Sequence, residues 1–218
     1  MKKLNFIIKY GLALLLLSFY SCESWLNVTP SDRLSEEMLF NDREGFVEAL
    51  NGVYIELNTN ELYGRNLTAG ALDVMGQYYS VASSSHVFYN YGGLVYTGNN
   101  EKALFDNMWQ KCYAVIACCN TIIEKCDENK AGLSPVWRGS IKGEALALRA
   151  MLHFDMLRLF GPLTSELDKE SIPYQTISDQ TVTPLLSGSE VIGLILDDLK
   201  NAVDLLKDTD PYFVEEEF

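Results

Sequence analysis

Apolar side chains recur every three or four residues in four stretches of the chain, which is the spacing of one face of an α-helix. In the first stretch, Asn41 and Glu44 have the spacing of a capping box. Three longer stretches cover residues 101–126, 136–162 and 190–206. The pattern predicts an all-α fold. The apolar positions are, helix by helix, Phe46, Leu50, Val53, Leu57; Phe105, Met108, Trp109, Cys112, Ile116, Cys119, Ile123, Cys126; Ile141, Ala145, Leu148, Leu152, Met156, Leu159; and Val191, Ile195, Leu199, Val203.

The ends of the predicted helices carry their own signals. Gly161 and Pro162 stop the third helix, because glycine suits a left-handed C-cap and proline cannot continue a helix. Ser187 and Glu190 form a capping box that opens the fourth helix. The second and third helices are joined by the short segment 127–135, so we expect an antiparallel pair.

The helix pair resembles part of a tetratricopeptide repeat, in which two helices occupy about 34 residues. Ala150 and Phe154 have the Ala-x3-Phe spacing of that repeat, and Pro162 follows eight residues after Phe154. Both helices are longer than the repeat allows. We therefore expect a tetratricopeptide-like helical scaffold rather than a regular array of repeats.

Two segments depart from the helical pattern. Residues 58–100 are rich in glycine and aromatic residues, with one short helix expected in 71–79. An irregular insertion of this length is usually functional or disordered, and its aromatic content argues against disorder. Residues 171–184 form the second segment, which we expect to be extended.

The N-terminus has the order of a bacterial lipoprotein signal. Three lysines precede the apolar run 10–21, which is shorter than the roughly 20 apolar residues of a membrane span. We therefore predict a signal peptide at residues 1–21, an acylated Cys22 and a tether at residues 22–40. An ordinary secretory signal that happens to contain a cysteine is the alternative.

Composition and cysteine spacing exclude several classes of partner. The formal charge is −13, which would repel a nucleic-acid backbone. Cys112, Cys119 and Cys126 repeat every seven residues, about 10 Å apart on a helix, which is beyond disulfide reach. We expect them to be small core residues. His86 and His153 have no ligand spacing to these thiols, so no metal or cofactor is expected.

Catalysis is not expected either. The chain has no G-x-S-x-G, P-loop or H-E-x-x-H motif. A glycoside hydrolase needs two carboxylates about 5 to 9.5 Å apart across a cleft. Asp197 and Asp198 are adjacent on a helix, where we expect a solvated face. Glu144 and Asp155 lie three turns apart on one helix and could not flank one bond.

Five segments occur in an order that is typical of one known family. In the third, Trp109 and Tyr113 precede the pattern Ile116-x3-Asn120-x-Ile-Ile. The set resembles the N-terminal half of the SusD/RagB family, surface lipoproteins that bind nutrients for an outer-membrane transporter. The segments are SCESWLNVTP (21–30), EGFVEALNGVY (44–54), MWQKCYAVIACCNTIIEKC (108–126), KGEALALRAMLHFDMLRLFGP (142–162), and SIPYQT (171–176) with VIGLILDDLKNAVDLL (191–206).

The resemblance implies a surface-exposed outer-membrane lipoprotein. Such a protein would bind polysaccharides or oligosaccharides, starch-like or other, and deliver them to a SusC-like TonB-dependent transporter. The helical domain would cover residues 41–218. Family members are usually more than twice this length, so we expect a truncated chain that lacks the C-terminal half and exposes the apolar face of residues 190–206. A peptide-binding or adaptor protein like RagB is the alternative.

The family's inter-helix region contributes to the ligand site, which directs attention to the aromatic segment 78–96. Tyrosine offers a sugar both a flat apolar face and a hydroxyl. Gln77, His86 and Asn90 lie nearby in the sequence. Alternatively, the rings pin a long loop to the helices beneath it. The candidate ligand-binding residues are Asp73, Tyr78, Tyr79, Tyr89, Tyr91, Tyr96, Asn99 and Asn100.

Overall fold

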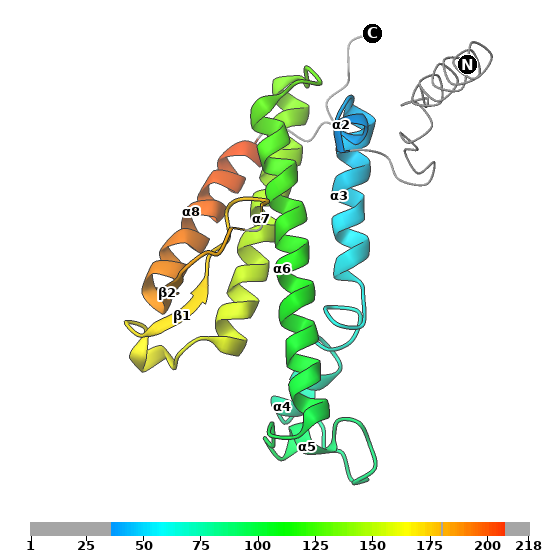
Figure 1. Cartoon of the computed structure of the whole chain (residues 1–218), viewed down its shortest axis with the longest axis vertical. Coiled ribbons are helices and arrows are strands. Elements are labelled where there is room, and N and C mark those ends of the chain that lie inside the picture. Colours follow the sequence, from blue (N-terminus) through cyan, green and yellow to red (C-terminus); the bar gives the residue numbers. More distant parts are fainter. Residues whose placement is uncertain (1–35, 180, 208–218) are drawn as a thin grey trace, which may run out of the picture. The chain divides into compact units, whose positions relative to one another are not determined.

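The computed structural model describes residues 36–179 and 181–207 of the chain (Figure 1). The predicted signal peptide at 1–21, the lipidated Cys22 and most of the predicted tether at 22–40 lie outside the described residues. These assignments remain predictions.

The described chain is mostly helical, as the apolar pattern predicts. Two short strands border the segment 171–184 that was expected to be extended, with β2 starting just after it. They pair in an antiparallel ladder, with Glu170 opposite Ser187 and Pro173 opposite Leu185. The elements are α2 (Glu36–Leu39), α3 (Arg43–Leu57), α4 (Ala71–Met75), α5 (Tyr89–Gly92), α6 (Asn99–Glu128), α7 (Pro135–Phe160), the 3₁₀ turn η2 (Thr164–Glu166), β1 (Glu170–Pro173), β2 (Leu185–Ser187) and α8 (Gly188–Leu206).

The helix starts follow capping chemistry, with one correction. Helix α3 is capped by Asp42, whose carboxylate accepts a hydrogen bond from Gly45 N at 2.9 Å, and not by Asn41. The predicted capping box of Ser187 and Glu190 at α8 is confirmed. A side-chain oxygen at these positions satisfies a backbone N–H that has no partner within its helix.

The helix ends correct a second prediction. Gly161 does end α7, but its φ of −81° and ψ of 174° are extended rather than left-handed. Glycine is needed there because a Cβ would lie 2.4 Å from the carbonyl oxygen of Leu157. The left-handed residue is Asn129 after α6, with a φ of 44°. Asparagine tolerates that conformation, and its Oδ1 accepts a hydrogen bond from Leu133 N in the turn that leads to α7.

The four long helices pack in a defined order, with α6 against both α3 and α7, and α7 also against α8 (Figure 1). The apolar stripes meet in one core, where Cys112, Cys119 and Cys126 are fully buried. Burial raises the pKa of the Cys119 and Cys126 thiols to about 12. These thiols are therefore unreactive core side chains, as the spacing predicts. The outer face of α8 exposes Leu196, Leu199, Val203 and Leu206.

A buried polar network crosses this core and corrects the interpretation of Asp198. Asp198 is only 7% exposed, while Asp197 is exposed. The guanidinium of Arg149, itself 6% exposed, donates two hydrogen bonds of 2.7 Å to the Asp198 carboxylate. Tyr174 donates a third at 2.5 Å. Asp198 therefore joins α8 to α7 and does not lie on a solvated face.

Asn120 and His153 extend the network to α6 and to the segment after β1. Asn120 accepts a hydrogen bond from Arg149 and donates to the carbonyl oxygens of Gln175 and Ile177. His153 stacks on the ring of Tyr174 at 3.9 Å and accepts a hydrogen bond from Gln175 N. Burial lowers the pKa of His153 to about 4. The imidazole is therefore neutral at pH 7.

Candidate functional site

The long insertion between α3 and α6 is ordered by its own small apolar cluster. Helices α4 and α5 lie near the N-terminal end of α6 (Figure 1). Tyr91 is 1% exposed and packs edge-on against Phe88 and Phe105, with ring centroids 6.0 Å apart in each pair. Val74 and Ala71 complete the cluster. The insertion is thus a folded unit attached to α6.

Side-chain hydrogen bonds fix the two arms of the insertion. Gln77 donates to the carbonyl oxygen of Gly92 at 2.9 Å, which joins the segment after α4 to the last residue of α5. Tyr79 donates to Ala69 O at 2.5 Å. Asn90 donates to Glu101 of α6 at 2.8 Å. A binding surface built on these arms is preorganised, which reduces the entropy lost when a ligand binds.

A hollow of about 380 Å³ lies between these two arms. Its volume falls in the range of about 300–1,000 Å³ that is usual for small-molecule sites. Tyr79 and Tyr89 contribute aromatic rings that are 42% and 43% exposed. The lining residues are Gln77, Tyr79, Ser80, Val81, Tyr89, Asn90, Gly92, Gly93 and Val95.

The backbone beside the hollow adopts two uncommon conformations. Gln77 and Leu94 have φ values of 60° and 55°. Few residues other than glycine adopt positive φ, and such strain clusters at ligand sites. Gln77 lines the hollow, and Leu94 lies between the lining residues Gly93 and Val95. The surrounding contacts therefore hold the hollow in a shape that the local sequence alone would not favour.

The structure separates the predicted candidates into groups. Tyr79 and Tyr89 both line the hollow. Tyr78 is 83% exposed and is not a lining residue, and Tyr96 packs edge-on against Phe105 at 5.5 Å. The remaining three are Asp73, partly buried in α4, and Asn99 and Asn100, exposed in the first turn of α6.

Tyr91 corrects the choice of candidates, because its buried ring has no face free for a ligand. The alternative interpretation was that the rings pin the loop to the helices beneath it. The packing of Tyr91 and Tyr96 agrees with that alternative. Conversely, Gln77 and Asn90 line the hollow, although the sequence placed them only near the candidates. For Asn90 the available signal was the glycine pair Gly92 and Gly93 that follows it, since paired glycines permit a tight reversal of the backbone. The sequence held no such signal for Gln77.

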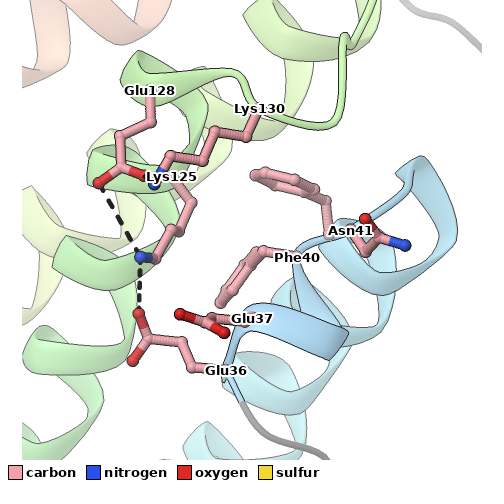
Figure 2. Close-up of a pocket in the computed structure, with 8 residues that line it drawn as sticks. Glu36, Glu37, Phe40, Asn41, Lys125, Glu128 and Lys130 are labelled. Carbon is pink, nitrogen blue, oxygen red and sulfur yellow. Dashed lines mark ion pairs between the residues drawn. The ribbon is translucent and has the colours of Figure 1, made fainter.

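A second hollow, of about 210 Å³, lies between α2 and the end of α6 (Figure 2). Most of its charged groups bind one another. Figure 2 shows Lys125 between Glu36 and Glu128, and the ion-pair distances are 2.8 Å and 3.9 Å. Lys130 pairs with Glu128 at 3.0 Å. This hollow is small, and both of its lysines are already paired, so it connects α2 to α6 rather than offering a ligand site.

Glu144 and Asp155, two of the carboxylates considered for catalysis, serve the scaffold. Glu144 accepts a hydrogen bond from Tyr54 at 3.0 Å, and Asp155 accepts from Tyr63 and Arg158. Within residues 36–179 and 181–207, no cluster of three His, Cys, Asp or Glu side chains is placed to hold a metal ion. None of the helices in that same part of the chain is both long and apolar enough to cross a bilayer.

Comparison with known proteins gives a family model and a relative that agree with each other. Residues 24–215 match the SusD-like family model described as "Starch-binding associating with outer membrane". A SusD-like protein of Formosa agariphila is 27% identical over 189 residues, which cover 84% of this chain and 34% of that protein.

Two solved structures from Bacteroides vulgatus share the fold. A SusD superfamily protein aligns with a TM-score of 0.59 at 21% identity, over 78% of this chain and 36% of its own. A candidate sugar-binding protein aligns with a TM-score of 0.60 at 25% identity, over 76% of this chain and 37% of its own. The chain thus spans about a third of the length of these relatives.

Proposed function

Since this chain belongs to the SusD-like family, we propose that it binds glycans and that the sugar occupies the hollow between residues 77–81 and 89–95. The family's description associates it with starch binding and with the outer membrane. One structural relative is described as a candidate sugar-binding protein. The proposal assigns this role to a particular surface of this chain.

The observation that carries the proposal is the combination of two exposed tyrosine rings with amide groups in one hollow. Tyr79 and Tyr89 provide flat apolar faces for the C–H surface of a sugar ring. Gln77 and Asn90 provide polar groups for its hydroxyls. Aromatic faces beside a few placed polar groups are common in small-molecule sites.

We extend the proposal to anchorage and delivery. An acylated Cys22 would hold the protein at the outer surface of the outer membrane, since two or more acyl chains bind a bilayer firmly. A SusC-like TonB-dependent transporter would receive the glycan. The support for both is the lipoprotein-like order of residues 1–22 and membership of a family described as associating with the outer membrane.

Alanine substitution of Tyr79 or Tyr89 should weaken binding of the best ligand from an oligosaccharide panel by about tenfold each. Losing an aromatic face costs about 0.5–1.5 kcal/mol beyond the loss of buried area, and about 1.4 kcal/mol is a tenfold change in Kd. Isothermal titration calorimetry measures the change.

Tyr78→Ala is the matched control, because this ring is more exposed than either but does not line the hollow. Its Kd should equal that of the unmodified protein. Equal affinities for all four proteins would place the glycan elsewhere. Binding of peptides alone, with no oligosaccharide bound, would contradict the proposed function and favour a peptide-binding protein.

A further inference from the structure

We propose that the ligand of this hollow is a neutral oligosaccharide, whose sugar units carry neither carboxylate nor sulfate. This inference rests on the proposed function and specifies its substrate class. It follows from three properties of the site: the absence of charge in its lining, the hydrogen-bonding character of its amides, and the contact of one amide with the carboxylate of Glu101.

The lining of the hollow contains no charged side chain. Residues 74–100, which include every lining residue, contain no Asp, Glu, Lys or Arg, although the chain as a whole carries a formal charge of −13. Proteins that bind carboxylate or sulfate groups usually supply arginine or lysine for charge-assisted hydrogen bonds. This surface has none to supply.

The basic residues closest in sequence serve other contacts or lie outside the hollow. Arg65 donates to Asn66 at 3.1 Å, and its guanidinium lies 5.8 Å from the centre of the Phe88 ring. Lys102 is exposed on α6 and is not a lining residue. Neither residue forms part of the surface that a bound sugar would contact.

The two amides of the lining present acceptors rather than donors. Gln77 Nε2 donates to the carbonyl oxygens of Val74 and Gly92, and Asn90 Nδ2 donates to the carboxylate of Glu101. Rotating either amide would place oxygen against oxygen, so these orientations are fixed by their partners. Among the described residues, no group donates to Gln77 Oε1 or Asn90 Oδ1. These oxygens can accept hydrogen bonds from sugar hydroxyls, whereas an anionic group has no proton to donate.

A charged group that contacts the lining is negative. Glu101 is buried, and its carboxylate accepts a hydrogen bond of 2.8 Å from the lining residue Asn90. The hydrogen bond from Asn90 lowers the pKa of this carboxyl group, which is therefore ionised at neutral pH. A second negative charge in the hollow would face this carboxylate and the acidic protein as a whole. Neutral hydroxyls avoid that repulsion.

The experiment compares oligosaccharides that differ only in charge. Each neutral oligosaccharide is paired with its C6-oxidised uronate and its O-sulfated derivative, and Kd is measured by calorimetry for the full chain at low and at high salt. We expect the neutral member to bind at least about tenfold more tightly at low salt, since an unpaired charge in a partly buried site is costly. High salt should narrow the difference by screening the repulsion.

A charge-introducing variant supplies a second readout. Val95 lines the hollow and is exposed, so Val95→Lys should fold and should raise the affinity for the uronate relative to the matched, uncharged Val95→Gln. An uronate or sulfate that binds the unmodified protein more tightly than its neutral partner, with binding weakened by Tyr79→Ala, would overturn the neutral class but leave the proposed function intact. Absence of binding by both members of every pair would overturn both proposals.

Discussion

Replacing Asp198 by alanine should lower the free energy of unfolding by about 3–5 kcal/mol, the cost of breaking a buried ion pair by removing one partner. The guanidinium of Arg149 would remain buried at 6% exposure without the carboxylate that accepts its two hydrogen bonds. Tyr174 would lose its acceptor as well. Chemical denaturation monitored by circular dichroism measures the change.

Asp197→Ala is the matched control, since this neighbour is an exposed carboxylate of the same helix. Its effect should stay within about 0.5 kcal/mol, as is usual at surface positions. The double variant Arg149→Met with Asp198→Leu should recover much of the lost stability, because it leaves no buried charge without a partner. Equal effects of Asp198→Ala and Asp197→Ala would contradict the role given to this pair.

His153 should make stability depend on pH. The pKa of this imidazole is about 4 in the folded chain and 6.5 when unperturbed. Between these values the unfolded chain binds a proton that the folded chain does not. The stabilisation is therefore fully present above pH 6.5 and is lost as the pH falls towards 4, by about 2–3 kcal/mol between about pH 7.5 and pH 4.5.

The test compares the two histidines of the chain by measuring the free energy of unfolding across this pH range. His153→Gln should show a shallower dependence than the unmodified protein, so that the difference between the two shrinks at low pH. His86→Gln is the control because it removes the other histidine, which is exposed in the loop, and this variant should keep the dependence that His153 causes. A profile for His153→Gln that runs parallel to the original would show that His153 does not cause the dependence.

The helical fold was predictable because its signal is local and repeated. From Met108 to Cys126, apolar residues recur with the period of a helix over many turns. Only a helix places all of these side chains on one face, where they can be buried together. Single capping residues carry less information. Asn41 and Asp42 are both good N-caps, and the sequence alone did not identify which of them the helix uses.

Burial of a polar residue could not be predicted in the same way. Asp197 and Asp198 are adjacent and chemically identical, and the difference between them comes from Arg149, far away in the sequence on another helix. The apolar period of a segment describes a single helix. It shows on which face of that helix Asp198 lies, but not which residues of other helices pack against that face. The hydrogen-bond network around His153 and Tyr174 could not be predicted from the sequence for the same reason.

The candidate site was predictable as a region but not residue by residue. The density of tyrosine and glycine in residues 78–96 marked the segment that supplies most of the hollow's lining. Tyr89 and Tyr91 are two positions apart in a one-turn helix, so they point to different sides, and only contact with Phe88 and Phe105 determines that Tyr91 is the buried one. The orientations of Gln77 and Asn90 depend equally on partners elsewhere in the fold.

The measurement that tests the central claim most directly is amide hydrogen exchange, followed by mass spectrometry, with and without a saturating neutral oligosaccharide. If the hollow is the glycan site, exchange should slow in residues 77–81 and 89–95, while the exposed face of α8 should be unaffected. Oligosaccharide binding with unchanged exchange in both arms of the hollow, and protection elsewhere in the chain, would contradict the account.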